Sequence, residues 1–167
     1  MRKLKIEDLD SMYECLTDKD VLKYMQIDGS QITKDSCKSF IKHSFTDTNK
    51  HFAIVDDSDR WIGTISLKHI DYKVGQAEYA IILSKYAQGK GFAYKATEDL
   101  LAYAFNVLNL NRVYLNVISD NQKANKLYSK VGFSYEGCFR KSISIRGKIY
   151  DLNWYSFLKD EYIKMHS

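Results

Sequence analysis

The residues with the clearest chemical potential are two glycines separated by one lysine, in the run Gln88-Gly89-Lys90-Gly91-Phe92-Ala93. An apolar strand pattern precedes this run and a helical pattern follows it, so we expect a turn at a helix start. The first four N–H groups of a helix have no partner inside it and lie at the positive end of its dipole, where phosphate binds well. Glycine also lets such a ligand approach the backbone. The run therefore predicts an anion-binding turn, with a simple tight connection as the open alternative.

Two common nucleotide-binding motifs do not fit this turn. A P-loop has four residues between its glycines and then Gly-Lys-Ser/Thr, whereas only Lys90 separates Gly89 from Gly91. A dinucleotide fold has its glycine turn after the first strand and contains a third glycine, and this turn lies in the middle of the chain. The P-loop and the dinucleotide-binding fold are therefore set aside as explanations of this turn.

The elements around the turn follow from hydrophobic periodicity. Residues Ala77 to Ser84 alternate like a strand, and Ala93 to Leu108 repeat at helical spacing. The chain has no repeats, low-complexity tracts or linkers, so we expect residues 1–167 to form a single domain. The other expected strands are Arg2–Ile6, His51–Val55, Trp61–Ile70, Arg112–Ile118 and two antiparallel strands within Phe133–Leu158, and the other expected helices begin at Glu7, Lys19, Lys34 and Asn121, with the helix from Lys34 reaching Phe45.

Composition limits the class of protein. With 167 residues, 45% apolar and 28% charged, the chain is long enough and apolar enough for one globular core. No apolar run approaches the roughly 18 residues of a membrane span, and the N-terminus enters a strand pattern without a signal peptide, so we expect a cytoplasmic protein without a membrane partner. The three cysteines and four histidines lack metal-ligand spacing, and we expect no metal site.

The net charge of +4 is unevenly distributed. Residues 1–60 hold 10 basic against 12 acidic residues, and residues 61–167 hold 15 against 9. The basic part contains the glycine turn, which suits an anionic cofactor, and the acidic part could attract a cationic substrate. Ordinary solvated faces are the alternative reading. Because no basic run carries interleaved aromatic residues, we expect no nucleic-acid partner.

A second motif follows further along the chain. In the stretch from Asn121 to Phe133, Ala124, Leu127, Tyr128 and Val131 share one helical face, and Gly132 has the position of a C-terminal cap. Taken alone, Tyr128 reads as a core aromatic residue and Asn121 as a helix N-cap.

Together the two motifs resemble those of the GNAT superfamily of N-acetyltransferases. The family's Arg/Gln-x-x-Gly-x-Gly/Ala is matched by residues 88–93, and its Asn-x-x-Ala-x-x-Leu-Tyr followed by Gly-Phe is matched between Asn121 and Phe133. The resemblance implies an α/β (α+β) domain with a mixed, mostly antiparallel, splayed sheet of about seven strands and four or five helices. It also implies acetyl-CoA as donor and an amine as acceptor, with residues 75–133 as the acetyl-CoA-binding core and residues 1–60 as the substrate-lip helices and first strands. The cofactor-binding residues that it implies are Ile81, Ile82, Leu83, Gln88, Gly89, Lys90, Gly91, Phe92, Ala93, Asn121 and Lys126.

The resemblance also implies how acetyl transfer would proceed. A primary amine with a pKa near 10.4 is mostly protonated at neutral pH and must lose a proton. Glu78 matches the glutamate of the ribosomal-protein and polyamine branches, and is the candidate base, with a structural hydrogen-bond partner as the alternative. The oxyanion would accept hydrogen bonds from strand N–H groups near Leu83. Tyr128 matches the tyrosine that protonates the departing thiolate.

The acceptor is less defined than the donor. The chain looks most like the ribosomal-protein and spermidine N-acetyltransferase branch, but polyamine enzymes carry Tyr-Trp-Phe-Glu-Glu-Pro where residues 24–29 read Tyr-Met-Gln-Ile-Asp-Gly. Tyr24 and Asp28 are the candidate acceptor-binding residues. Polyamines, amino sugars, antibiotic amines and peptide N-termini all stay open, and the chain could form a homodimer or higher homo-oligomer. A non-catalytic acyl-CoA-binding or sensing domain is the alternative function.

Overall fold

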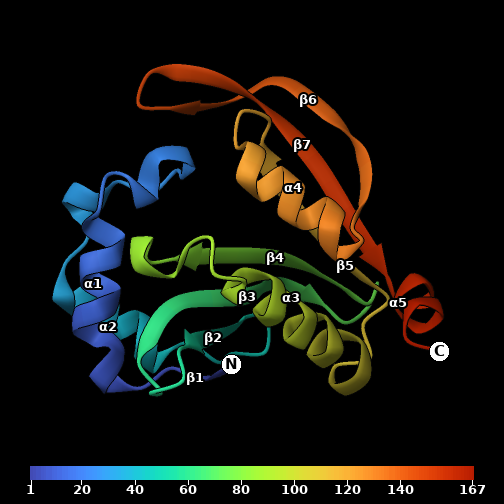
Figure 1. Ribbon diagram of the computed structural model, residues 1–167, viewed down its shortest axis with the longest axis horizontal. Helices are drawn as coiled ribbons and strands as arrows, with labels where there is room; N and C mark the ends of the chain where they lie inside the picture. Colours follow the sequence, from blue (N-terminus) through green and yellow to red (C-terminus); the bar gives the residue numbers. More distant parts are fainter.

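The computed structural model describes all residues from Met1 to Ser167, and its centre is one seven-stranded sheet (Figure 1). The strand order is β1-β2-β3-β4-β5-β7-β6, and every neighbouring pair is antiparallel except β4 and β5, which are parallel. This confirms the mixed, mostly antiparallel sheet that the resemblance implies. The strands are β1 (Arg2–Lys3), β2 (Lys50–Val55), β3 (Trp61–Asp71), β4 (Gln76–Leu83), β5 (Arg112–Ile118), β6 (Ser134–Ile145) and β7 (Lys148–Leu158).

Five α-helices cover the sheet, and they divide between two cores. Phe52 and Ile54 of β2 pack in the larger core with α3 and α4, whereas Ala53, which points to the opposite face, packs in a smaller core with α1 and α2. In Figure 1, α3 and α4 lie over one face of the sheet, and α1 and α2 lie at its left-hand end. The helices are α1 (Leu9–Thr17), α2 (Lys34–Lys42), α3 (Phe92–Ala102, continued by a π-helical turn Tyr103–Val107), α4 (Gln122–Val131) and α5 (Lys159–Met165), with short 3₁₀ turns at Ile6–Asp8, Val21–Tyr24, Gly29–Gln31 and Lys85–Ala87.

The structure differs from the sequence prediction in the end of the first strand, in the end of the helix that starts at Lys34 and in an additional C-terminal helix. The first strand ends at Lys3 rather than Ile6, because the buried Asp8 carboxylate accepts hydrogen bonds from Arg2 and from the Lys5 N–H (2.8 Å) and turns the chain into a 3₁₀ helix. The second long helix ends at Lys42 rather than Phe45. Helix α5 was not predicted; it begins where the Glu161 carboxylate accepts the Leu158 N–H at 2.9 Å.

The sheet splits between β4 and β5. These strands pair only from Gln76 to Glu78 against Arg112 to Tyr114. Beyond that point β4 stays paired with β3 as far as Leu83, and β5 stays paired with β7 as far as Ile118. The two halves of the sheet therefore diverge from Tyr79 onward, as Figure 1 shows, and the expected splay is confirmed.

Candidate active site

The glycine turn, residues 88–93, connects the parted end of β4 to α3. Gly89 (φ 75°) and Gly91 (φ 83°) have left-handed backbone, which favours glycine because other L-residues are strained there. The N–H groups of residues 89–94 find no acceptor in the protein, and Lys95 is the first whose N–H is bonded, to the Gly91 carbonyl at 3.2 Å. The turn therefore presents a row of free donors at a helix start, and this row fits a diphosphate.

The side chains of the turn leave its front open. A Cβ at Gly89 or Gly91 would meet no atom within 4 Å, and Gln88 and Lys90 are exposed. Gln88 Nε2 donates to the Leu83 carbonyl at 3.3 Å, while the Phe92 side chain packs against the larger core. The predicted residues from Gly89 to Ala93 thus form one accessible surface of backbone donors, while the Gln88 N–H is bonded to the Lys85 carbonyl at 3.4 Å.

The parted stretch of β4 leads from this turn towards the point where the strands meet. Ile81 and Leu83 pack against the larger core and Ile82 against the smaller one, so their side chains alternate across the sheet. Their backbone is paired with β3 on one edge, and no bond to β5 is made on the other. From Tyr79 to Leu83 this open edge spans roughly 13 Å at about 3.3 Å per residue, which leaves room for an extended ligand arm.

Tyr128 of α4 lies at the closed end of the split. Its ring is 5.6 Å from that of Tyr79, the first β4 residue beyond the β4–β5 pairing, and the side chain is only 6% exposed. Burial raises the pKa of Tyr128, so the side chain stays a protonated phenol at neutral pH. Its hydroxyl makes no hydrogen bond in the protein. Trp154 Nε1 is the sole fully buried side-chain nitrogen or oxygen without a hydrogen-bond partner, so the Tyr128 hydroxyl is not fully buried and reaches accessible space. Tyr128 can therefore donate a proton to a ligand in the split.

The start of α4 holds the other predicted residues of the second motif. Asn121 is the N-cap, because its side chain accepts the Ala124 N–H at 3.3 Å. Lys126 is exposed and makes no hydrogen bond or ion pair. The cap explains Asn121 structurally, and a cofactor contact of Asn121 or Lys126 stays a prediction.

Asn125 is a residue that the sequence analysis missed. Its Nδ2 donates to the carbonyls of Asn121 (2.8 Å) and Ile118 (3.1 Å), and its Oδ1 accepts from Asn153 (2.9 Å) and Tyr155 (3.0 Å). Asn125 thus joins α4, which carries Tyr128, to the end of β5 and the middle of β7. Asparagine is unfavourable inside a helix, so its presence within the predicted helix from Asn121 was the sequence signal that could have indicated a special role for Asn125.

Glu78 lies at the same closed end of the split, on the opposite face of the sheet from Tyr79 and Tyr128. Its carboxylate accepts from Lys68 Nζ at 3.1 Å and contacts His69 Nδ1 at 2.8 Å, and the side chain is 19% exposed. Neighbouring Tyr114 is its partner on β5. The candidate acid, Tyr128, and the candidate base, Glu78, therefore lie on opposite faces of the sheet at the closed end of the split.

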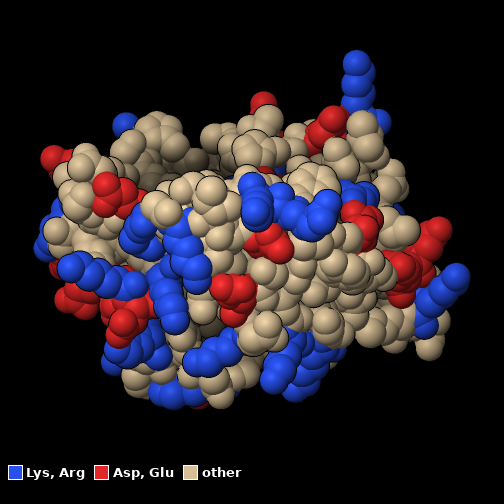
Figure 2. Space-filling view, turned by 90° about the horizontal axis from the view of Figure 1, so that it is seen from above, with Lys and Arg blue, Asp and Glu red and all other residues tan.

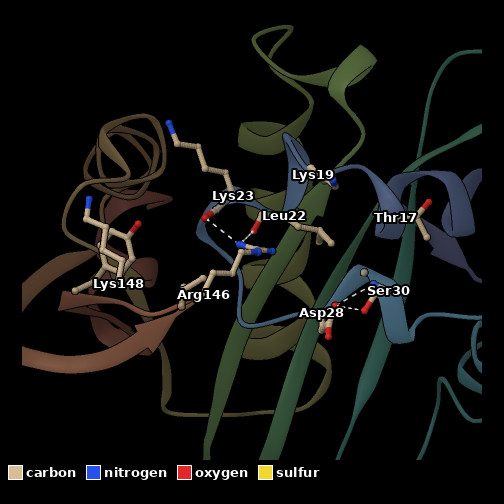
Figure 3. Close-up of a pocket in the computed structure, with 11 residues that line it drawn as sticks. Thr17, Lys19, Leu22, Lys23, Asp28, Ser30, Arg146 and Lys148 are labelled. Carbon is tan, nitrogen blue, oxygen red and sulfur yellow. Dashed lines mark hydrogen bonds between the residues drawn. The ribbon is translucent and has the colours of Figure 1, made fainter.

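The predicted acceptor residues lie apart from this pair, at the open end of the split. Asp28 lines a cavity of about 670 Å³ between residues 17–30 and the tip of the β6–β7 hairpin (Figure 3). Tyr24 packs with Ile118, the last residue of β5, and with Tyr150. The cavity also contains basic residues that the sequence analysis did not assign, because they come from distant segments: Lys19, Lys23, Arg146 and Lys148.

Charged side chains of both signs are spread over the face seen from above in Figure 2, where Lys and Arg alternate with Asp and Glu without forming one continuous patch. No group of three or more His, Cys, Asp or Glu side chains is placed to hold a metal ion. None of the helices has both the length and the apolar character needed to cross a membrane.

Comparison with known proteins bears on this geometry. Residues 1–134 match the family model described as Acetyltransferase (GNAT) domain. The chain is 35% identical over 167 residues to a Bacillus licheniformis protein called Uncharacterized N-acetyltransferase p20, covering 97% of this chain and 93% of that protein. Among solved structures, spermidine N-acetyltransferase from Vibrio cholerae in complex with CoA and spermine has a TM-score of 0.89 and 29% identity, covering 97% of this chain and 96% of that chain. A dodecameric structure of the Vibrio cholerae enzyme has a TM-score of 0.83 and 29% identity over 99% of this chain and 96% of that chain.

Proposed function

This chain belongs to the GNAT acetyltransferase family and is an acetyl-CoA-dependent N-acetyltransferase, and we propose that Tyr128 and Glu78 act from opposite faces of its sheet to acetylate a small primary amine. The observation that carries this proposal is the split between β4 and β5. Free backbone donors lie beyond its open end, and a buried phenol lies at its closed end. The extended arm of acetyl-CoA can therefore run from the glycine turn through the split to the Tyr128 phenol.

The residues present fit acetyl-CoA. Backbone N–H groups of residues 89–94 would hold the diphosphate, and the open edge of β4 from Ile81 to Leu83 would hold the arm. When bound, acetyl-CoA supplies an acetyl thioester whose leaving group is a thiolate. The Tyr128 phenol is kept protonated by burial and donates its proton to that sulfur.

Glu78 faces the side from which the amine would arrive. Its carboxylate oxygens are held by Lys68 and His69, so the carboxylate is fixed beside the closed end of the split. In our proposal Glu78 accepts the proton that the ammonium must lose, directly or through water. Separation of acid and base by the sheet prevents the two groups from exchanging a proton directly.

The acceptor is a small amine in this proposal. Spermidine N-acetyltransferases among the relatives support this class, and the comparisons give no support to the non-catalytic sensing alternative. A peptide N-terminus stays a prediction. We also propose that the chain forms a homo-oligomer, on the basis of the dodecameric Vibrio cholerae enzyme, and light scattering on the purified protein tests this.

A thiol-release assay with acetyl-CoA tests the proposed function. The panel contains polyamines, amino sugars, aminoglycosides and short peptides with free N-termini. We expect amine-dependent release of CoA, with mass spectrometry showing one acetyl group on the amine. Binding of CoA without release for any member of the panel would contradict the proposal.

A further inference from the structure

The cavity at the open end of the split has a basic lining. It is bounded on one side by residues 17–30 and on the other by the hairpin tip, Ile145–Tyr150. Ile145 and Tyr150 pack with Ile118 at the end of β5, so the cavity adjoins the parted strands. Figure 3 shows side chains from both segments meeting around it, with Arg146 reaching across from the hairpin.

Four cations line this cavity against a single carboxylate, Asp28. Asp28 keeps its charge, because its Oδ1 accepts only from the neutral donors Ser30 N (3.0 Å) and Ser30 Oγ (2.7 Å), and the cations still outnumber it four to one. Lys19 and Lys23 form no ion pair. Lys148 lies 3.6 Å from Asp120 in a solvent-exposed pair that leaves most of its charge available.

Arg146 is positively charged and spends only some of its five N–H donors inside the protein. The guanidinium donates to the carbonyls of Leu22 (3.1 Å) and Ile27 (3.3 Å), and these acceptors are neutral. No carboxylate forms an ion pair with it. Arg146 therefore fixes residues 22–27 against the hairpin and adds to the positive potential of the cavity.

A ligand with several ammonium groups would be repelled by this lining, whereas an anion would be attracted. We propose that the acceptor amine carries a carboxylate or a phosphate, and that Lys23, Arg146 and Lys148 bind this anionic group while the amine enters the split. This inference rests on the proposed function and specifies its acceptor class.

Matched pairs of amines test the proposal. We would compare 1,5-diaminopentane with 6-aminohexanoate, which differ in the charge of the far end, and glucosamine with glucosamine 6-phosphate. The carboxylate and phosphate arms distinguish the two anion types. We expect kcat/KM to be at least about 10-fold higher for the anionic member of a pair, and this advantage to shrink as salt is raised.

Charge reversal locates the effect in the cavity. Lys23→Glu combined with Lys148→Glu should lower kcat/KM for the anionic amine by at least about 10-fold and leave it level or raised for the diamine. Lys164→Glu on α5, an exposed lysine in another part of the molecule, is the matched control and should change neither. The Kd of CoA should be the same in all three proteins, which shows that they are folded.

The outcomes separate this inference from the proposed function. Turnover of the diamines alone would retain the acetyltransferase and overturn the anionic acceptor. Turnover of anionic amines that is unaffected by the charge-reversed variant would overturn the assignment to this cavity. If no amine of either kind is acetylated while CoA binds, the proposed function fails, and the inference that depends on it fails with it.

Discussion

The proposed cofactor side and the proposed acceptor side of this molecule are built in different ways. On the cofactor side, β4, the glycine turn and α3 follow one another in the chain. Only one further strand, β5, separates α3 from α4. On the acceptor side, Arg146 contacts Leu22 from 124 positions away, and the cavity exists only because the hairpin tip meets residues 17–30. The proposed cofactor site is thus formed by segments that are neighbours in the chain, whereas the proposed acceptor site is formed only when distant segments pack together.

Tyr128→Phe gives the largest expected effect and tests whether the cofactor side contains the acid. Loss of the hydroxyl should lower kcat by roughly 10²-fold, the low end for one acid group, because the ring still fills the space beside Tyr79. The Kd of CoA should stay nearly the same. Equal turnover of the variant with its true acceptor would remove Tyr128 from the chemistry. Tyr155→Phe is the neighbouring control, since its hydroxyl is bonded to Asn125 instead.

A matched pair of glycine substitutions compares the two sides directly. Gly91 (φ 83°) and Gly147 (φ 78°) have the same left-handed backbone, and a Cβ at either meets nothing within 4 Å. Alanine should therefore add similar strain, about 1–2 kcal/mol, at both positions. Because alanine favours relaxation of the free turn away from this backbone, which CoA must then restore, we expect Gly91→Ala to raise the Kd of CoA by roughly 10-fold, since 1.4 kcal/mol is a factor of ten. Gly147→Ala should leave that Kd unchanged and raise KM for the amine.

Calorimetry with CoA and steady-state kinetics with the amine measure these two effects. A rise in the Kd of CoA for Gly147→Ala, or an unchanged Kd for Gly91→Ala, would contradict the division into two sides. Gly91→Asn serves as a milder control because asparagine tolerates the left-handed region better than alanine.

Sequence patterns predicted the backbone of β4, the glycine turn and α3 well, because the geometry of these elements is set by neighbours in the chain. The alternation in β4, the two glycines and the helical stripe of α3 each specify local backbone, and the mixed, splayed character of the sheet followed from the family resemblance. The acceptor cavity could not be predicted in this way. Lys19, Lys23 and Lys148 look like ordinary surface lysines in the sequence, and the acidic balance of residues 1–60 even pointed to a cationic substrate. These lysines line one cavity because Arg146 joins the hairpin tip to residues 22–27, and a contact between such distant segments cannot be predicted from local sequence patterns.

Asn125→Ala tests the connection that holds α4 in place. The substitution leaves the donors of Asn153 and Tyr155 without their acceptor, while the carbonyls of Ile118 and Asn121 keep backbone N–H donors, so we expect a loss of about 1–3 kcal/mol in the free energy of unfolding. For a chain of this length, each kcal/mol corresponds to a fall of about 2–4 °C in Tm. Because α4 carries Tyr128, kcat should fall more than KM changes. Asn116→Ala, which removes an asparagine that makes no side-chain hydrogen bond, should lower neither.

The smallest expected effect concerns pH and arises at His51, outside both the glycine turn and the acceptor cavity. His51 of β2 packs against Phe40 of α2 and contacts Ser66 Oγ at 2.7 Å, and burial, together with Lys68, lowers the pKa of His51 to about 4. The unfolded chain has a histidine pKa of about 6.5, so between these values the unfolded state binds the proton more readily and stability falls as pH falls. Residues 75–133 contain no histidine. Thermal melts from pH 7 to pH 4 should therefore show a decline in Tm that His51→Asn reduces and His166→Asn, in the exposed C-terminal tail, does not. An identical decline in all three proteins would assign the acid sensitivity to carboxylates instead.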